Sequence, residues 1–510
     1  RAPPRRGRAA GESLAALLAG GEAGHPALIV PDSGEVLTYT QVATRVEALA
    51  QRLAGLGVRR GDRVALALPN GPDVVLLLLA VTALGAAAAP LNPAYTESEL
   101  RFYLEDVDAA ALLVPPGGAE AARAARPEGA VLVEAAFNPE GVLEVEVPGR
   151  TLTPAPPEAP SGDDVALMLH TSGTTGRPKR VPLRHRNLDA SIANIAATYQ
   201  LGPGDVSLCA MPLFHVHGLL ASTLSTLATG GTVVVPSPFN PLAFWGVVRE
   251  HKPTWYSAVP TIHRMVLSRA RQERPAGAES LRFVRSCSSA LPPEMMAEIE
   301  RRLDAPVLEA YGMTEACHQI ASNPLPPAAR RAGSVGVGTG VEVAVLDEAG
   351  GPLPAGSAGQ VAIKGPNVID GYAANPEANA ESFANGWFLT GDQGVLDERG
   401  YLTLIGRIKE LINRGGEKIS PREIDEVLLR HPAVAEAVAF GTPHDTLGEE
   451  VAAAVVLNGE TGEQELLAHC RAQLAAFKVP RKLFIVEAIP RTATGKVQRR
   501  KVAEVIGAGR

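Results

Sequence analysis

A run of nine residues, TSGTTGRPK at 171–179, has the composition of a loop that binds phosphate groups. Its glycines let backbone N–H groups approach phosphate oxygens, its hydroxyls add donors, and its lysine adds positive charge. The loop differs from the GxxxxGK[ST] motif, because its glycines are three residues apart and no Gly-Lys pair is present. We predict a phosphate-binding loop, with a flexible surface turn as the alternative. The candidate ligands are Thr171, Ser172, Gly173, Thr174, Thr175 and Lys179.

Other polar residues lie directly after apolar runs that are typical of strands. The runs are VSLCAMP (206–212), TVVVPS (232–237), TWYSAVP (254–260), LRFVRSCS (281–288) and PVLEAYG (306–312). Helical patterns separate several of them, for example at 292–303. In an open α/β sheet, ligands bind beyond the carboxyl ends of the strands. We therefore expect a site near His215, His217, Ser288, Ser289 and the segment 311–318.

The elements that must position these residues alternate between strands and helices. Residues 62–116 show a strand–helix–strand rhythm, and the spacing of Thr96 and Glu99 predicts a capping box that opens a helix. Such alternation predicts an α/β fold of mostly parallel sheets covered by helices. The apolar stretch 74–91 is interrupted by Gly85 and Pro90, so it predicts a buried helix leading into a buried strand instead of a membrane span.

The pattern changes twice towards the carboxyl end of the chain. Residues 333–405 contain short alternating runs punctuated by Gly, Pro and Asp, which predict an antiparallel sheet or small barrel. After about residue 406, the sequence Ser420-Pro421-Arg422-Glu423 predicts a capping box that opens a helix, and strand-like runs follow. We predict a large α/β domain with a β-rich lobe over 1–406 and a small, mobile α+β domain over 407–510.

Composition and charge exclude several classes of function. The 510 residues contain 48 basic and 55 acidic side chains, a formal net charge of −7, and only 4% aromatic residues. Nucleic-acid binding usually needs a basic surface or aromatic stacking platforms, so we predict no nucleic-acid partner. The four cysteines, Cys209, Cys287, Cys317 and Cys470, form no CxxC pair and predict reduced, buried thiols in a cytoplasmic protein. The interrupted apolar stretch 74–91 predicts no membrane association.

Five motifs in order resemble the signatures of the adenylate-forming superfamily, which includes acyl-CoA synthetases, amino-acid adenylation domains and firefly-type luciferases. They are the loop 171–179, YGMTE at 311–315, TGD at 390–392, GRIKELI at 406–412 and PRTATGK at 490–496. The resemblance covers essentially the whole chain. It implies a large adenylate-forming domain, a small cap domain joined by a hinge, and small-molecule substrates bound by a monomer or homodimer.

The resemblance also implies roles for the nucleotide ligands. The loop would bind the ATP phosphates, while Tyr311 would stack on adenine beside Ser289, Ala310 and Gly312. Asp392 would accept the ribose hydroxyls, because a carboxylate suits paired hydroxyl donors, and Arg407 would reach the ribose or phosphates. Thr314 would bind the α-phosphate, and Glu315 would hold Mg²⁺, which favours carboxylate and phosphate oxygens. The residues expected to be catalytic are Lys496, His215, Thr314 and Glu315.

Two half-reactions follow from the resemblance. A carboxylate and MgATP would give an acyl-adenylate and pyrophosphate, with Lys496 as the cation between two anionic reactants. The small domain would then rotate about Lys409, and the thiol of CoA would displace AMP. Gly415 and Gly416 would allow the pantetheine arm to approach closely. The basic cluster 499–501 could contact a CoA phosphate, with a solvated helix face as the alternative.

The expected acid-binding residues are polar. His215, His217, Ser288 and His318 favour a short anionic acid over a fatty acid, which needs an apolar pocket. The alternative is that the histidines are hydrogen-bonded core residues. The strings PLFHVHGLL, LRFVRSCSSALPP and YGMTEACHQI closely resemble those of oxalate–CoA ligases, which form oxalyl-CoA from oxalate. The competing interpretations are another short-chain, medium-chain or aryl acyl-CoA synthetase and a non-catalytic nucleotide-binding protein.

Overall fold

The computed structural model describes residues 13–138, 143–149, 153–171, 178–236, 238–270, 274–491 and 497–507. Its contacts divide the chain into two compact units. The first contains residues 1–343 and 363–386, and the second contains 344–362 and 387–510. The domain boundary predicted at 406 falls within strand β21 (Leu402–Arg407) and stays a prediction.

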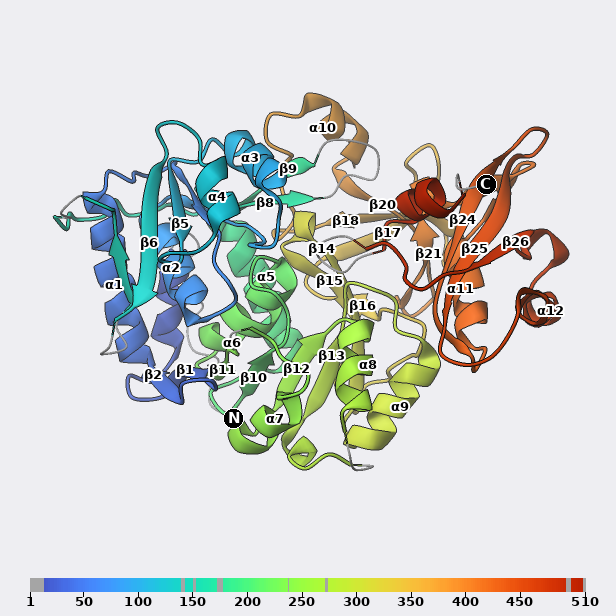
Figure 1. Ribbon diagram of the computed structural model, residues 1–510, viewed down its shortest axis with the longest axis horizontal. Coiled ribbons are helices and arrows are strands. Elements are labelled where there is room, and N and C mark those ends of the chain that lie inside the picture. The colour runs from blue at the N-terminus through green and yellow to red at the C-terminus, as the bar shows by residue number, and fades with distance from the viewer. Residues whose placement is uncertain are drawn as a thin grey trace. The chain divides into compact units, whose positions relative to one another are not determined.

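The first unit contains a seven-stranded sheet whose central strands are parallel (Figure 1). Its edge strands, β7 and β9, pair antiparallel with their neighbours. Strands β8 and β9 form the two sides of the predicted phosphate loop. In sheet order the strands are β7 (Leu143–Glu146), β6 (Val131–Phe137), β5 (Ala111–Val114), β3 (Arg63–Leu66), β4 (Ala87–Pro90), β8 (Val165–Thr171) and β9 (Lys179–Arg184).

A nine-stranded sheet carries most of the remaining candidate residues. Six neighbouring strands, from β14 to β1 in the sheet order, are parallel, and β15, β16 and β2 are antiparallel. The five strands predicted after residue 200 are all present. The order is β16 (Val337–Gly338), β15 (His318–Ser322), β14 (Val307–Met313), β13 (Phe283–Ser286), β12 (Trp255–Ala258), β10 (Val206–Cys209), β11 (Thr232–Val234), β1 (Pro26–Val30) and β2 (Glu35–Thr38).

Helices and short turns connect the strands of this unit, and α1 packs beside α2 (Figure 1). The helices are α1 (Tyr39–Gly55), α2 (Pro72–Ala83), α3 (Glu97–Asp106), α4 (Glu120–Ala125), α5 (His185–Tyr199), α6 (Ser225–Ala228), α7 (Phe244–His251), α8 (Pro260–Ser268), α9 (Pro293–Leu303) and α10 (Pro376–Ser382). The shorter helical segments are η1 (Leu14–Gly20), η2 (His217–Leu224), η3 (Ala278–Ser280) and η4 (Thr314–Ala316).

Two local predictions in the first unit are confirmed. The apolar stretch 74–91 forms buried helix α2 followed by buried strand β4, since ten of the twelve α2 residues are buried. No described helix is both long enough and apolar enough to span a bilayer. The capping box at α3 is also present, because the Thr96 hydroxyl accepts from the Glu99 N–H and the Glu99 carboxylate accepts from the Thr96 N–H.

Two small sheets follow the nine-stranded sheet in the chain. The first has the order β17 (Glu342–Leu346), β18 (Ala358–Lys364), β20 (Trp387–Leu396) and β19 (Phe383–Ala384), with β21 antiparallel to β20. The second has the order β23 (Glu417–Ile419), β22 (Ile412–Arg414), β25 (Gly448–Leu457) and β24 (Val434–His444), with β26 (Lys482–Ile485) beside β25. Helices α11 (Pro421–Leu429), α12 (Glu463–Gln473) and α13 (Arg499–Val502) and segments η5 (Ile408–Glu410), η6 (Ala476–Lys478) and η7 (Ala503–Gly507) complete this part.

One predicted capping box is wrong. Helix α11 begins at Pro421 as expected, but the Ser420 side chain does not cap it. The Ser420 hydroxyl instead donates to the Ile405 carbonyl at 2.7 Å, and the Glu423 carboxylate binds the Lys478 ammonium. Hydrogen bonds to residues distant in sequence therefore form in place of the capping hydrogen bonds that the Ser420–Glu423 spacing favours.

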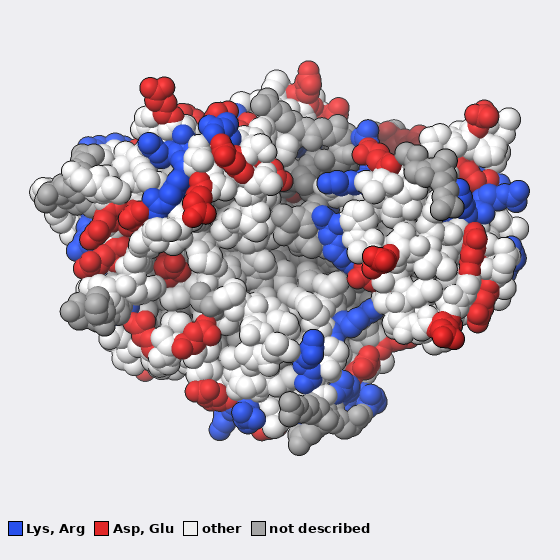
Figure 2. Space-filling view, in the orientation of Figure 1, with Lys and Arg blue, Asp and Glu red and all other residues white. Residues whose placement is uncertain are grey.

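Charge and cysteine placement agree with the composition. Over the face shown in Figure 2, described basic and acidic side chains are interspersed. The four cysteines are free and buried, as predicted.

Candidate functional site

A sharp turn between β14 and β15 shapes the candidate site. The two strands pair antiparallel, with Met313 opposite His318, and η4 connects them. Cys317 and His318 both have positive φ, 48° and 91°. Gly312 lies so close to the returning strand that a Cβ atom would stand 1.8 Å from the His318 carbonyl oxygen. Only glycine fits there, which explains why the motif contains one.

Three consecutive carbonyls of this turn accept hydrogen bonds from different segments. The Ile369 N–H donates to the Glu315 carbonyl at 2.9 Å, and the Asn367 amide donates to the Ala316 carbonyl at 2.8 Å. The Ser191 hydroxyl of α5 donates to the Cys317 carbonyl. The turn is thus held by α5 and by the segment 366–373, which stabilises its unusual backbone conformation.

The Glu315 carboxylate, proposed as the Mg²⁺ ligand, is buried and hydrogen-bonded. Its Oε1 atom accepts from the Tyr372 hydroxyl at 2.8 Å. The Lys179 ammonium lies 4.5 Å from the centroid of the same Tyr372 ring, which is within the range of a cation–π contact. Tyr372 thereby connects the predicted metal ligand with the lysine of the predicted phosphate loop.

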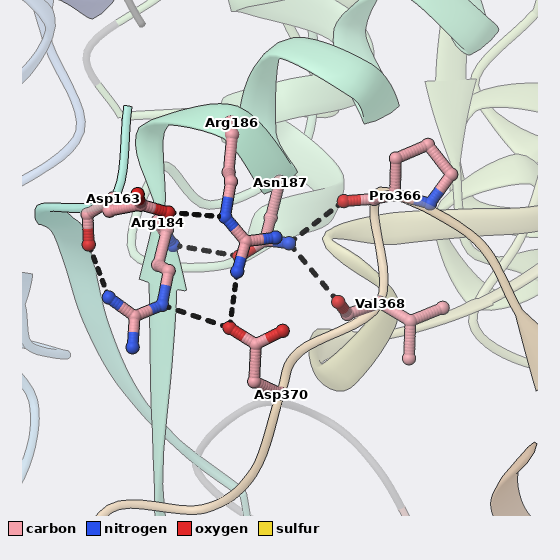
Figure 3. Close-up of polar contacts among 7 residues, drawn as sticks. All are labelled: Asp163, Arg184, Arg186, Asn187, Pro366, Val368 and Asp370. Carbon is pink, nitrogen blue, oxygen red and sulfur yellow. Dashed lines mark hydrogen bonds and ion pairs between the residues drawn. The ribbon is translucent and has the colours of Figure 1, made fainter. Parts of the chain in front are cut away.

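A polar cluster at the start of α5 holds the segment that carries Tyr372 (Figure 3). The Asn187 amide donates to the carbonyls of Pro366 and Val368 at 2.8 and 3.1 Å. The Asp370 carboxylate accepts from Arg184 at 3.1 Å and also from Arg186. The Asp370 ion pairs are partly exposed and are individually weak. The buried Asn187 bonds therefore contribute most to holding this segment.

Both ends of the predicted phosphate loop bind one carboxylate. His170 and Arg180 are opposite each other on β8 and β9. The His170 ring lies 2.9 Å from Asp106, at the end of α3, and the Arg180 guanidinium lies 3.4 Å from the same carboxylate. Burial lowers the pKa of His170, although Asp106 opposes this effect. Asp106 thus links the end of α3 to the two residues that flank the predicted loop.

The predicted acid-binding residues His217, Ser288 and His318 lie together. The His217 Nδ1 atom is 3.0 Å from the Ser288 hydroxyl oxygen, and the rings of His217 and His318 are stacked with centroids 5.0 Å apart. His217 begins η2, a π-helical segment, a form frequent at functional sites. Both rings are buried, while Ser288 is partly exposed and has a positive φ of 68°. This arrangement presents hydroxyl and imidazole groups at the ends of β13 and β14.

Burial keeps the imidazoles of His217 and His263 neutral. Burial, together with the nearby His318 and Arg285, lowers the pKa of His217 well below 6.5. His263, on α8, is fully buried with its Nδ1 atom 3.3 Å from the Tyr256 hydroxyl, and burial lowers its pKa to about 4. His263 is therefore a hydrogen-bonded core residue, whereas His217 faces Ser288.

The remaining candidates of the first unit lie on or near the ends of several strands in both large sheets. Ala310 and Tyr311 are buried on β14, and Thr314 is partly buried in η4. Ser289 is exposed, and His215 is partly buried two residues before η2. Thr171 ends β8 opposite Lys179, the first residue of β9. The roles proposed for these residues stay predictions.

Asp392 and Arg407 belong to the second unit and bind each other. They are opposite residues on β20 and β21, and the Arg407 Nε atom lies 2.8 Å from an Asp392 carboxylate oxygen. Asp392 is buried, and Arg407 is exposed. The ion pair orients the Asp392 carboxylate, which the resemblance assigns to the ribose hydroxyls. The roles predicted for Asp392 and Arg407 in nucleotide binding are therefore linked.

The two glycines predicted to face CoA form a hairpin turn. Gly415 and Gly416 connect β22 to β23 with φ of 60° and 94°, the pattern of a two-residue turn that needs positive φ at both positions. Lys409 is exposed in η5. Within the basic cluster, Arg499 is bound to Asp425 and Glu410 and Arg500 lies 3.3 Å from Glu504, so neither is an unpaired cation.

Several predicted ligands lie outside the described residues. They are Ser172, Gly173, Thr174, Thr175 and Lys496.

Sequence reasoning missed two residues of this region. Tyr372 lies in a loop-like stretch with no signal beyond its ring. Arg285 is a charged residue within the otherwise apolar strand β13, and it is fully buried. A charge inside a predicted buried strand is a signal that could have identified it.

The described residues suit a magnesium ion held largely by phosphate oxygens. No group of three or more His, Cys, Asp or Glu side chains that could hold a metal occurs within the described ranges. Mg²⁺ is often bound by one or two carboxylates together with substrate phosphates. The buried carboxylate of Glu315, which is hydrogen-bonded to Tyr372, fits that type of site.

Comparison with known proteins decides the family. Residues 18–373 match the family described as AMP-binding enzyme, and residues 423–496 match its C-terminal domain. The chain belongs to the AMP-binding enzyme family. The predicted adenylate-forming fold, with a large N-terminal and a small C-terminal domain, is thereby confirmed.

The chain resembles named members of the AMP-binding enzyme family over nearly its full length. It is 47% identical to an oxalate–CoA ligase of Arabidopsis thaliana over 92% of this chain and 93% of that protein. It is 44% identical to an oxalate–CoA ligase of Saccharomyces cerevisiae over 94% of each. The structure of Bacillus subtilis o-succinylbenzoate CoA synthetase in complex with ATP and magnesium ion matches with a TM-score of 0.85 and 30% identity, over 96% and 99% of the two chains.

Replacement of Tyr372 by Phe tests the contact between its hydroxyl and Glu315. The ring that faces Lys179 remains, but the Glu315 carboxylate loses a donor, so we expect the KM for MgATP to rise about tenfold, as for a lost hydrogen bond to a charged group. Steady-state pyrophosphate release at varied MgATP measures it. Tyr95→Phe, which removes a hydroxyl elsewhere in the first unit, should leave the KM unchanged. An unaltered KM in Tyr372→Phe would show that the hydroxyl does not orient Glu315.

The buried histidines predict a loss of stability in acid. In the unfolded chain their pKa is near 6.5, so below that pH the unfolded state binds more protons than the folded state. Stability is therefore complete above pH 6.5 and decreases as the pH falls towards 4. For His263 alone, the free energy of unfolding should fall by about 2 kcal/mol between pH 7 and pH 5. Urea unfolding at pH 5, 6 and 7 measures this, and His263→Gln should have a correspondingly shallower pH dependence; equal slopes would contradict the prediction.

Proposed function

We propose that this chain is an oxalate–CoA ligase, which converts ATP, oxalate and CoA to AMP, diphosphate and oxalyl-CoA. The observation that supports this substrate best is the grouping of His217, Ser288 and His318 at the ends of β13 and β14. Oxalate is a small dianion, and its second carboxylate needs hydrogen-bond donors that an apolar fatty-acid pocket would lack. The similarity to oxalate–CoA ligases of a plant and a yeast supports the same choice.

In the first half-reaction, an oxalate oxygen attacks the α-phosphorus of ATP, and the bond from that phosphorus to the pyrophosphate oxygen breaks. We assign Lys496 to the space between the two anions and Thr314 to the α-phosphate. The loop from Thr171 to Lys179 binds the departing phosphates through backbone N–H groups, hydroxyls and the lysine ammonium. Glu315 would hold Mg²⁺, and the ion would supply further positive charge to the phosphate oxygens.

Binding of the nucleoside is assigned to two sets of residues. Tyr311 contacts the adenine ring, with Ser289, Ala310 and Gly312 at its edge. Asp392 accepts the ribose hydroxyls while it also binds Arg407, because a carboxylate has several acceptor positions. His215 lies beside the reacting carboxylate as a further catalytic residue.

In the second half-reaction, the CoA sulfur attacks the carbonyl carbon of the oxalyl-adenylate. The bond from that carbon to the phosphate oxygen breaks, AMP leaves with the electron pair, and the thiol proton passes to solvent. We assign Lys409 as the hinge that brings Gly415 and Gly416 to the pantetheine arm. The turn formed by the two glycines has no side chains, which leaves its backbone open to a narrow ligand.

A panel of acids tests the substrate. With ATP, Mg²⁺ and CoA, oxalate should give a kcat/KM at least tenfold above that of acetate, octanoate and coumarate, measured by AMP and acyl-CoA formation. If octanoate or coumarate is preferred, the enzyme is an acyl- or aryl-CoA synthetase and the oxalate assignment is wrong. The absence of AMP release with every acid would favour a non-catalytic nucleotide-binding protein.

A Lys496→Ala variant tests the adenylation step. Removal of the ammonium leaves two anionic reactants without a cation between them, so we expect oxalate-dependent pyrophosphate release to fall at least a hundredfold, typical of the loss of a charged group that acts in the transition state. Lys501→Ala, which removes another lysine close in sequence, serves as the control and should retain oxalate-dependent pyrophosphate release, a step that precedes the use of CoA. Near-normal pyrophosphate release from Lys496→Ala would refute the assigned role.

A further inference from the structure

Arg285 is a fully buried guanidinium next to the proposed acid-binding residues. It lies on β13, opposite Ser257 on β12 and Leu308 on β14. Its Nη1 atom donates to the Ser257 hydroxyl oxygen at 3.0 Å and approaches His217 Nε2 at 3.4 Å. Its other nitrogens donate to the Tyr199 hydroxyl oxygen at 2.7 Å and to Gln319 Oε1 at 3.0 Å.

Within the described part of the chain, no carboxylate forms an ion pair with Arg285. Its partners are two hydroxyls, an amide and an imidazole, and the Cys287 thiol is close by. Burial raises the pKa of Tyr199, so its hydroxyl is neutral near pH 7. The carboxylate of Glu309 is opposite Ser286, one position further along β13, and so lies on the other face of the sheet. Burial of a charge without a counter-charge lowers the free energy of unfolding.

Each hydrogen bond in the series from Arg285 to the partly exposed Ser288 can be assigned a donor and an acceptor. A guanidinium can only donate, so its contacts require acceptors at the Ser257 oxygen and at His217 Nε2. Ser257 then donates its own proton to His217 Nε2, from which it is 2.6 Å away. Because the His217 ring is neutral, its single proton lies on Nδ1 and is donated to the Ser288 hydroxyl oxygen. The Ser288 proton is left to point away from His217, on the partly exposed side.

We propose that Arg285 determines specificity for acids that carry a second negative charge. It acts as a positioning residue, since its geometry makes Ser257 and His217 donate in sequence and leaves the Ser288 hydroxyl as a donor to the substrate. Its positive charge, which no described carboxylate neutralises, favours a dianion over a monoanion of similar size. This role of Arg285 rests on the proposed function, and it identifies the residue that makes the site prefer a dianionic acid.

A comparison of oxalate with glyoxylate tests this proposal, because glyoxylate is of similar size but has one carboxylate. We expect Arg285→Gln to raise the KM for oxalate about 10- to 100-fold, as for the loss of charge-assisted hydrogen bonding. The oxalate-to-glyoxylate ratio of kcat/KM should fall at least tenfold, while the KM for ATP stays within about twofold of the wild-type value. Arg285→Lys, which retains the charge, should recover part of the ratio.

Arg282→Gln is the matched control. Arg282 lies three residues before Arg285, binds Asp205 at 2.9 Å and donates to the Tyr199 carbonyl at 3.1 Å. Its replacement therefore removes a nearby charge but none of the hydrogen bonds that lead from Arg285 through Ser257 and His217 to Ser288. It should leave the ratio unchanged. If Arg285→Gln does not fold, as judged by thermal unfolding, Ser257→Ala interrupts the series and should lower the ratio in the same direction.

The outcomes separate the two proposals. A wild-type enzyme that uses oxalate, with a ratio unaltered in Arg285→Gln and Ser257→Ala, would overturn the role of Arg285 alone. A wild-type enzyme that prefers monoanionic acids would overturn both proposals. A preference for a different dianion would overturn oxalate as the substrate, and a tenfold loss of selectivity for that dianion in Arg285→Gln would still support the role of Arg285.

Discussion

The candidate site depends on the turn between β14 and β15, whose backbone is held in a conformation that most side chains disfavour. Cys317 and His318 have positive φ there, and Gly312 must approach the returning strand without a side chain. The cost of this backbone is offset because Ser191, Asn367 and the Ile369 N–H satisfy three successive carbonyls. As a result, Glu315 points to Tyr372, and His318 stacks on His217. One strained turn thus positions both the proposed metal ligand and part of the acid site.

The first unit contains local positive groups, although the whole protein has a negative net charge. The chain has a net charge of −7, yet its proposed substrates are all anions. Local groups must therefore provide the attraction, and three kinds are present. Lys179 beside Tyr372 offers an ammonium, Arg285 offers a buried charge, and the neutral His217 offers a directed hydrogen bond. Buried hydrogen-bond series of this kind are strong because the surrounding dielectric is low.

In the second unit, strand register and a few ion pairs position the motif residues. Asp392 and Arg407 are cross-strand neighbours, so the β20–β21 register alone places the guanidinium on the carboxylate. The Gly415-Gly416 turn is likewise set by its hairpin register, with Arg414 opposite Glu417. Arg499 binds Asp425 and Glu410, which assigns one of the three clustered cations to the fold of this unit. Asp392 and Arg407, which come from two different motifs, are thus structural partners of one another.

The sequence by itself determined the class of fold, the order of the motifs and the polar character of the acid site. Periodic apolar runs set the strands, the Thr96–Glu99 spacing set a helix start, and His217, Ser288 and His318 were identifiable because they follow strands. Only the tertiary structure decided which residues partner with which. It moved Ser420 from capping a helix to binding the Ile405 carbonyl, and it brought Tyr372 to Glu315 across 57 residues of sequence. It also showed Arg285 without a carboxylate partner among the described residues. Local patterns report periodicity and caps, whereas hydrogen bonds between distant segments depend on how sheets and turns pack.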